Sequence, residues 1–237
     1  MRHKKRRAAA WLVLGLSLCA MAVLSYRLAG IWQAYRQGDE SYGQLAGLAR
    51  PAAADGDVDL APLQAVCPDA AAWLYGPGTV IDYPVMRAAD YDHYLRRLPD
   101  GTANANGSLF IDYHCAPDFT DRLTVVYGHH MKSGRMFGSL KGYKRQAYYE
   151  RHPAMVLYTE SGGRRIDLLY GCVIAAGEWR ERAFMLEENL EALLACAARG
   201  TTFTSAAQYS PGDRVLALST CSYEFDGARY VVLGVIR

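Results

Sequence analysis

A cysteine that ends one apolar segment and an arginine that begins the next have types and spacing that suit covalent chemistry. The segments RVLALSTC (214–221) and RYVVLGVI (229–236) have the composition of two strands, with a turn-forming Asp-Gly pair between them. A hairpin symmetric about Phe225 puts Cys221 opposite Arg229, and cross-strand partners have Cβ atoms about 5 Å apart. The sequence therefore predicts a thiol and a guanidinium side by side at the mouth of a hairpin.

A cysteine nucleophile needs a base or a cation that raises its thiolate fraction. His129 and His130 follow a third apolar segment, 123–127, and supply an imidazole. Arginine is always protonated, so Arg229 can bind substrate or hold an oxyanion but cannot act as a general base. We predict Cys221 as nucleophile, His129 as proton-transfer group and Arg229 as oxyanion or substrate stabiliser. The alternative is a packed strand-end cysteine beside a solvated arginine.

Short runs of β-branched and aromatic residues bounded by turn residues predict a mainly antiparallel β domain. The runs are 79–81, 108–111, 123–127, 155–159, 165–174, 214–219 and 229–236. One apolar stripe predicts a helix over 181–199, and it consists of Leu186, Leu190, Leu193, Leu194 and Ala197. Shorter helices are expected at 91–97 and 136–150. We find no internal repeat, which indicates one compact domain of about 180 residues.

The N-terminus carries a membrane signal. Five Lys and Arg residues before residue 8 are followed by nineteen uncharged residues, 8–26, long enough as a helix to cross a bilayer core of about 30 Å. The charge bias puts the N-terminus in the cytoplasm and the rest of the chain outside. We predict a basic cytoplasmic segment (1–7), a transmembrane helix (8–26), a stalk (27–57) and a catalytic domain (58–237). A cleaved signal peptide is the alternative, because Ala20-Met21-Ala22 fits a cleavage site.

Composition excludes several classes of protein. With the five N-terminal cations set aside, 21 of the 26 basic residues remain against 24 acidic ones, so the body of the chain lacks the basic balance of a nucleic-acid binder. The 237 residues include six cysteines but no pair of Cys or His residues at zinc spacing. Five cysteines lie outside the membrane segment, which leaves at least one free thiol. We expect no metal and no organic cofactor.

Four motifs resemble the class B sortases in the family's order and approximate spacing. They are TVIDYPV (79–85), NGSLFIDY (106–113), YGHHMKSGRMFG (127–138) and LSTCSY (218–223), the last followed by Arg229. The resemblance covers about Leu60 to Arg237. It implies a membrane-anchored cysteine transpeptidase of Gram-positive bacteria with a sortase-type closed β-barrel, N-terminal helices and an extra helix before the penultimate strand. The helix expected at 181–199 falls in that place.

The resemblance also implies roles for particular residues. Cys221 matches the family nucleophile, His129 the proton-transfer histidine and Arg229 the oxyanion or substrate arginine. Leu95, Ser219 and Thr220 match positions that line the substrate groove in relatives, although Leu95 also suits a core and Ser219 a hydrogen-bonded strand. His130 is assigned no catalytic role.

The implied reaction cleaves a sorting motif near the C-terminus of secreted proteins through a thioacyl-enzyme. The acyl group then passes to an amine of a peptidoglycan precursor or a pilin subunit. Two other functions stay open at this stage: a secreted cysteine protease or hydrolase with the same residues, and a non-catalytic, membrane-tethered binding domain. The sequence does not disclose the motif, the accepting amine, the client proteins or the oligomeric state.

Overall fold

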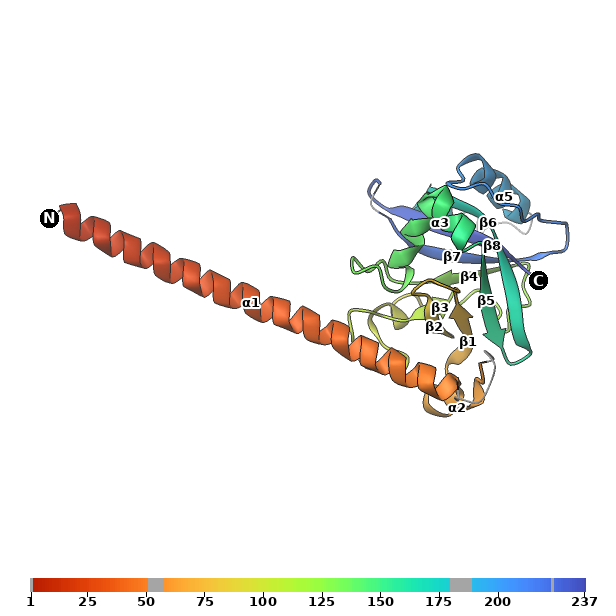
Figure 1. Cartoon of the computed structure of the whole chain (residues 1–237), viewed down its shortest axis with the longest axis horizontal. Helices are drawn as coiled ribbons and strands as arrows, with labels where there is room; N and C mark the ends of the chain where they lie inside the picture. The colour runs from red at the N-terminus through yellow and green to blue at the C-terminus, as the bar shows by residue number, and fades with distance from the viewer. Residues whose placement is uncertain (1, 51–57, 180–188, 223) are drawn as a thin grey trace. The chain divides into compact units, whose positions relative to one another are not determined.

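A closed barrel of eight strands forms the core of the compact unit from Ser41 to Arg237 (Figure 1). The computed structural model describes residues 2–50, 58–179, 189–222 and 224–237, with side chains described from residue 11 onward. The strands are β1 (Ala70–Tyr75), β2 (Asp82–Met86), β3 (Leu109–Ile111), β4 (Leu123–Tyr127), β5 (Ala154–Thr159), β6 (Gly162–Ala175), β7 (Arg214–Cys221) and β8 (Ala228–Ile236). They close in the order β1-β2-β3-β4-β7-β8-β6-β5. Only the β2–β3 and β4–β7 pairs are parallel, which confirms the expected closed and mainly antiparallel barrel.

Three details of the strand prediction are wrong, and the first is that β2 was not among the expected runs. Strand β1 was not expected, because its alanines favour helix and its residues are buried on both faces rather than in alternation. Residues 79–81 were expected to form a strand but lie in the turn before β2. There the Thr79 hydroxyl donates to the Gly76 carbonyl at 2.8 Å and accepts the Ile81 amide at 3.0 Å. A side chain that bonds its own backbone in this way favours a turn.

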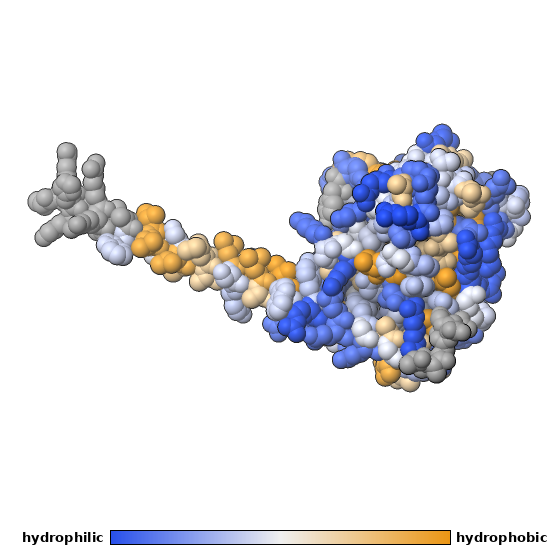
Figure 2. Space-filling view, viewed as in Figure 1, coloured by the Kyte–Doolittle hydropathy of each residue, from blue (hydrophilic) through white to orange (hydrophobic). Residues whose placement is uncertain are grey.

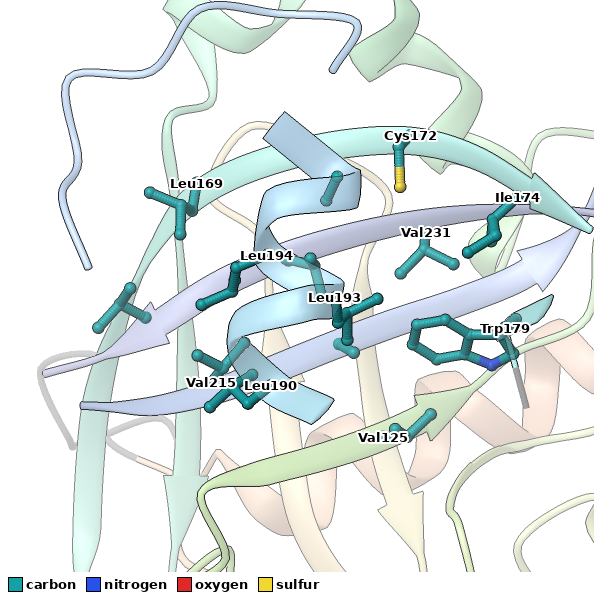
Figure 3. Close-up of a cluster of buried hydrophobic side chains, with 14 residues drawn as sticks. Val125, Leu169, Cys172, Ile174, Trp179, Leu190, Leu193, Leu194, Val215 and Val231 are labelled. Atoms are coloured by element: carbon teal, nitrogen blue, oxygen red, sulfur yellow. The ribbon is translucent and has the colours of Figure 1, made fainter. Parts of the chain in front are cut away.

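The helix before the penultimate strand is confirmed as α5 (Asn189–Arg199). Its Leu190, Leu193 and Leu194 pack with Val215 and Val231 of the barrel (Figure 3). Residues 181–188 of the expected helix, including Leu186, lie outside the described residues. The segment 136–150 forms a 3-10 helix, η2 (Phe137–Lys144), and a short helix, α3 (Gln146–Arg151). Of the helix expected at 91–97, only the 3-10 turn η1 (Tyr94–Arg96) is present.

The N-terminal helix α1 (Arg2–Ala49) is long and apolar enough to cross a membrane, and within the described ranges it is the one helix that is. Large apolar side chains from Trp11 to Trp32 are exposed along it, and much of the surface of this helix is orange, that is hydrophobic, in Figure 2. Transfer of these apolar groups from water to the core of a bilayer would be favourable.

The last turns of α1 belong to the compact unit that runs from Ser41 to Arg237. Leu45 and Ala49 pack in one buried cluster with Leu63 of the short helix α2 (Ala61–Val66) and with Trp73 of β1. The compact unit thus begins inside the predicted stalk. The division into a cytoplasmic segment (1–7), a transmembrane helix (8–26), a stalk (27–57) and a catalytic domain (58–237) stays a prediction.

Candidate active site

Cys221 and Arg229 face each other at the turn end of the β7–β8 hairpin, which we call its mouth. The antiparallel register pairs them directly, as the hairpin symmetry predicted. The Arg229 guanidinium donates a hydrogen bond from Nη1 to the Sγ atom of Cys221. Cys221 is exposed and Arg229 is half-buried, so the thiol is open to a substrate while the cation beside it is held by the barrel.

The parallel register of β4 and β7 brings His129 to the same place. Tyr127 pairs with Ser219, and the Gly128 amide donates to the Ser219 carbonyl at 3.2 Å. His129, two residues beyond Tyr127, lines the same cavity as Cys221. Gly128 is needed here, because an added Cβ would lie 2.5 Å from side-chain atoms of Leu109 and Phe137. Close packing therefore fixes the point at which the His129 segment leaves the strand.

One cavity of about 280 Å³ is lined by all six residues that the sequence singled out. Cys221, His129 and Arg229 line it together with Leu95, Ser219 and Thr220. Ser219 is fully buried, and its hydroxyl has no hydrogen-bond partner among the described residues. The Thr220 hydroxyl donates to the Gly128 carbonyl at 2.9 Å, which ties the end of β7 to the histidine segment.

The sequence analysis missed the aromatic wall of this cavity. The wall includes Tyr91, Phe110, Tyr127 and Trp179. The Tyr91 hydroxyl donates to Asp112 at 2.9 Å, and this carboxylate is completely buried at the end of β3. These residues come from four separate segments, so no local pattern could have identified them as neighbours.

The electrostatic setting keeps both histidines neutral at neutral pH. Burial lowers the pKa of His129, and the positive charge of Arg96 lowers it further. Burial is also the main cause that lowers the pKa of His130, with the charges of Lys141 and Lys144 adding to it, whereas a hydrogen bond to the Cys221 backbone opposes the shift. A neutral imidazole can accept a proton from a thiol, which an imidazolium cannot.

No group of three or more His, Cys, Asp or Glu side chains suited to a metal ion occurs in the described part of the chain. All six cysteines are free thiols. Among the described residues that line the cavity are the thiol of Cys221, the imidazole of His129 and the guanidinium of Arg229.

This fold and site define a class: closed eight-stranded barrels that carry a thiol, an imidazole and a guanidinium at neighbouring strand ends. Comparison with known proteins identifies the family. Sortase B of Listeria monocytogenes is 31% identical over 181 residues, which are 74% of this chain and 73% of the relative. No family model matches the chain.

Solved structures agree with the curated relative. The Staphylococcus aureus sortase B–substrate complex matches with a TM-score of 0.75 at 22% identity, covering 86% of this chain and 98% of that one. A sortase B complexed with triglycine matches with a TM-score of 0.76 at 23% identity, covering 85% and 98%. The chain belongs to the class B sortases, a family of transpeptidase enzymes.

Proposed function

We propose that this protein is a cysteine transpeptidase that cleaves a sorting motif of secreted proteins and joins the acyl fragment to an amine. The observation that carries the proposal is the hydrogen bond from the Arg229 guanidinium to the Cys221 thiol at the mouth of a cavity that His129 also lines. The guanidinium therefore lies where it can donate to an oxyanion that forms when the thiol adds to a carbonyl.

In the first half of the reaction, neutral His129 takes the proton of the Cys221 thiol. The thiolate attacks the scissile carbonyl, and a carbon–sulfur bond forms as the carbonyl oxygen becomes an oxyanion. Arg229 donates N–H groups to this oxyanion. When the carbon–nitrogen bond breaks, His129 returns its proton to the departing amine. The products are a thioester on Cys221 and a released C-terminal fragment.

In the second half, an amine attacks the thioester carbonyl and forms a second tetrahedral oxyanion beside Arg229. His129 accepts the proton that the amine loses as the new amide bond forms. The carbon–sulfur bond then breaks, and His129 passes this proton to the departing Cys221 thiolate, which restores the free thiol and the neutral imidazole. Transfer to an amine instead of water distinguishes this reaction from that of a protease.

The substrates of the proposed reaction follow from the related complexes. A sortase B has been solved with its substrate and another with triglycine, which supports a sorting-motif peptide as the acyl donor and an amine as the acceptor. We propose that Leu95, Ser219 and Thr220 contact the peptide, since all three line the cavity beside Cys221. The accepting amine belongs to a peptidoglycan precursor or a pilin subunit.

We also propose that α1 anchors the enzyme with its N-terminus in the cytoplasm and its catalytic unit outside. Arg2, Lys4, Lys5, Arg6 and Arg7 precede the apolar stretch, and a single cation, Arg27, follows it closely. This bias is typical of an N-terminus that stays inside.

The test is to incubate the full chain in detergent micelles with a library of sorting-type pentapeptides, with and without triglycine. Mass spectrometry reads both peptide products and protein mass, with Cys221→Ala as control. A Cys221-dependent acyl adduct that passes to triglycine supports transpeptidation and reveals the motif. Hydrolysis at a rate that triglycine does not change indicates a protease. The lack of any adduct, together with an unreactive Cys221, indicates a binding domain.

A further inference from the structure

Lys144, the last residue of η2, touches the neighbours of both reactive residues of the hairpin. Its ammonium group donates to the Ser222 hydroxyl at 3.4 Å, and Ser222 directly follows Cys221. It also lies 4.9 Å from the ring centroid of Tyr230, which directly follows Arg229. One cation thus contacts the residue that follows β7 and a residue of β8, each directly after a proposed reactive residue.

Glu224 completes this contact. Lys144 pairs with one of its carboxylate oxygens, and the Ser222 hydroxyl donates to the other. Burial opposes the charge on Glu224, but these two hydrogen bonds outweigh it and hold its pKa at about 2. Both hydrogen bonds favour the charged carboxylate, which ties η2 to Ser222 directly after Cys221.

The backbone that carries Lys144 is itself well fixed. Tyr143, its neighbour, is fully buried and donates its hydroxyl to the His152 carbonyl at 3.1 Å. The Tyr143 carbonyl accepts the Thr202 hydroxyl at 3.0 Å, and that hydroxyl also lies 2.7 Å from the hydroxyl of Tyr230. Lys144 therefore extends from a well-packed part of the backbone and can position Ser222 and Glu224.

We propose that Lys144 is a positioning residue of the reaction, whose ammonium group holds Ser222, Glu224 and Tyr230 so that Cys221 and Arg229 stay aligned. This inference rests on the proposed function but has a readout of its own. The Ser222 amide donates to the Ala228 carbonyl at 2.8 Å and closes the hairpin just beyond Cys221. Amide exchange of this segment reports the link without any catalysis.

The test compares full-length Lys144→Met, which keeps the length of the side chain but removes its charge, with Lys144→Arg and Lys141→Met. Lys141 is the matched control, because it is exposed on the same 3-10 helix and its charge also reaches His130. The pentapeptide library and triglycine serve as probes, and iodoacetamide with mapping of the Cys221 peptide measures thiol reactivity. Hydrogen exchange by mass spectrometry covers the segment around residues 222 and 228.

We expect Lys144→Met to slow Cys221 acylation by about 10- to 100-fold, since misplacement of a reacting group by roughly 1 Å has effects of this size. The peptide concentration for half-maximal rate should stay within about twofold, because uniform binding is not affected. Amide exchange at Ser222 should accelerate, Lys144→Arg should recover most of the rate, and Lys141→Met should resemble the wild type.

Unchanged exchange at Ser222, or an acylation rate within twofold of wild type, would overturn the proposal. The same holds if Lys141→Met matches Lys144→Met, because the effect would then be one of charge at a distance. If the wild-type protein forms no adduct with any peptide, the proposed function fails. In that case, amide hydrogen exchange at Ser222 still tests whether Lys144 holds this residue, and the reactivity of the Cys221 thiol with iodoacetamide tests whether Lys144 aligns Cys221.

Discussion

The β7–β8 hairpin has two ends that differ sharply. At the core end, which is the part of the ladder away from the turn, Leu216, Ala217 and Leu233 are completely buried. At the mouth, Cys221 and Glu224 are exposed; Arg229 donates to Cys221, and Lys144 pairs with Glu224. Both ends share one continuous antiparallel ladder. Burial of the apolar side chains therefore fixes the register of β7 with β8. This register in turn pairs Cys221 with Arg229 at a place that water and substrate can reach.

If the mouth carries the chemistry, Cys221→Ala should have the largest effect. We expect loss of acylation and transfer by at least roughly 10⁴-fold, in line with removal of a catalytic nucleophile. Because Cys221 is exposed, the free energy of unfolding should change by less than about 0.5 kcal/mol. Intact-mass analysis after incubation with the peptide library and a urea titration measure the two effects. An adduct that persists in this variant would place the nucleophile elsewhere.

Arg229→Ala should have the next largest effect. Loss of an oxyanion donor lowers turnover by about 100- to 1000-fold, and Arg229→Lys should lie between because it keeps the charge but not the planar fork. Steady-state kinetics on the most reactive library peptide measures both variants. Cleavage at the wild-type rate by Arg229→Ala would remove this residue from the mechanism.

At the core end we expect the opposite result, a large effect on stability and a small effect on activity. Leu193 of α5 is fully buried in the cluster behind the hairpin, so Leu193→Ala should lower the free energy of unfolding by about 2–5 kcal/mol. The specific activity of the folded fraction should stay near that of the wild type. Ala192→Ser, an exposed change in the same helix, is the control. A large loss of activity in stably folded Leu193→Ala would mean that the two ends are not separable.

The smallest effect is expected from Arg96→Gln on the titration of His129. The positive charge of Arg96 disfavours the imidazolium, so its removal should raise the pKa of His129. Burial remains as the larger cause, and the pKa should stay below the ordinary value of a histidine. The imidazole proton signals in an NMR titration measure this shift, with Arg97→Gln as the neighbouring control. A downward shift would show that Arg96 does not act through its charge.

The lowered pKa of His129 also predicts how acid affects the fold. Below the ordinary histidine pKa, His129 takes up a proton in the unfolded chain but not in the folded chain. The free energy of unfolding should therefore be highest above that pKa and should decrease as the pH falls through the lowered pKa of the folded chain. Arg96→Gln should weaken this loss. Urea titrations at a series of pH values check the sign.

Much of the site was predictable from local pattern. The Asp-Gly turn and the two apolar runs sufficed to pair Cys221 with Arg229, and the register confirms this pairing. The apolar stripe of α5 likewise indicated its packing face, because a period of 3.6 residues puts Leu190, Leu193 and Leu194 together. Where a partner lies within one hairpin or one helix, spacing alone carries the information.

Other parts depended on contacts between distant segments. The three alanines of β1 do not suggest a strand, and only the pairing with β2 and β5 makes them one. The Thr79 hydroxyl converts an apparent strand into a turn. Tyr91 and Trp179 reach the cavity from segments about 90 residues apart, so no periodicity could reveal them.

The sequence by itself determined the chemical groups, the hairpin that pairs two of them, the apolar N-terminal stretch and the barrel family. Only the tertiary structure decided that His129 lies beside the hairpin, that an aromatic wall encloses the site, and that Lys144 links η2 to the residues after Cys221. The physical reason is range: hairpin and helix patterns repeat over a few residues, whereas barrel closure and ion pairs join segments whose proximity exists only once the whole core is packed.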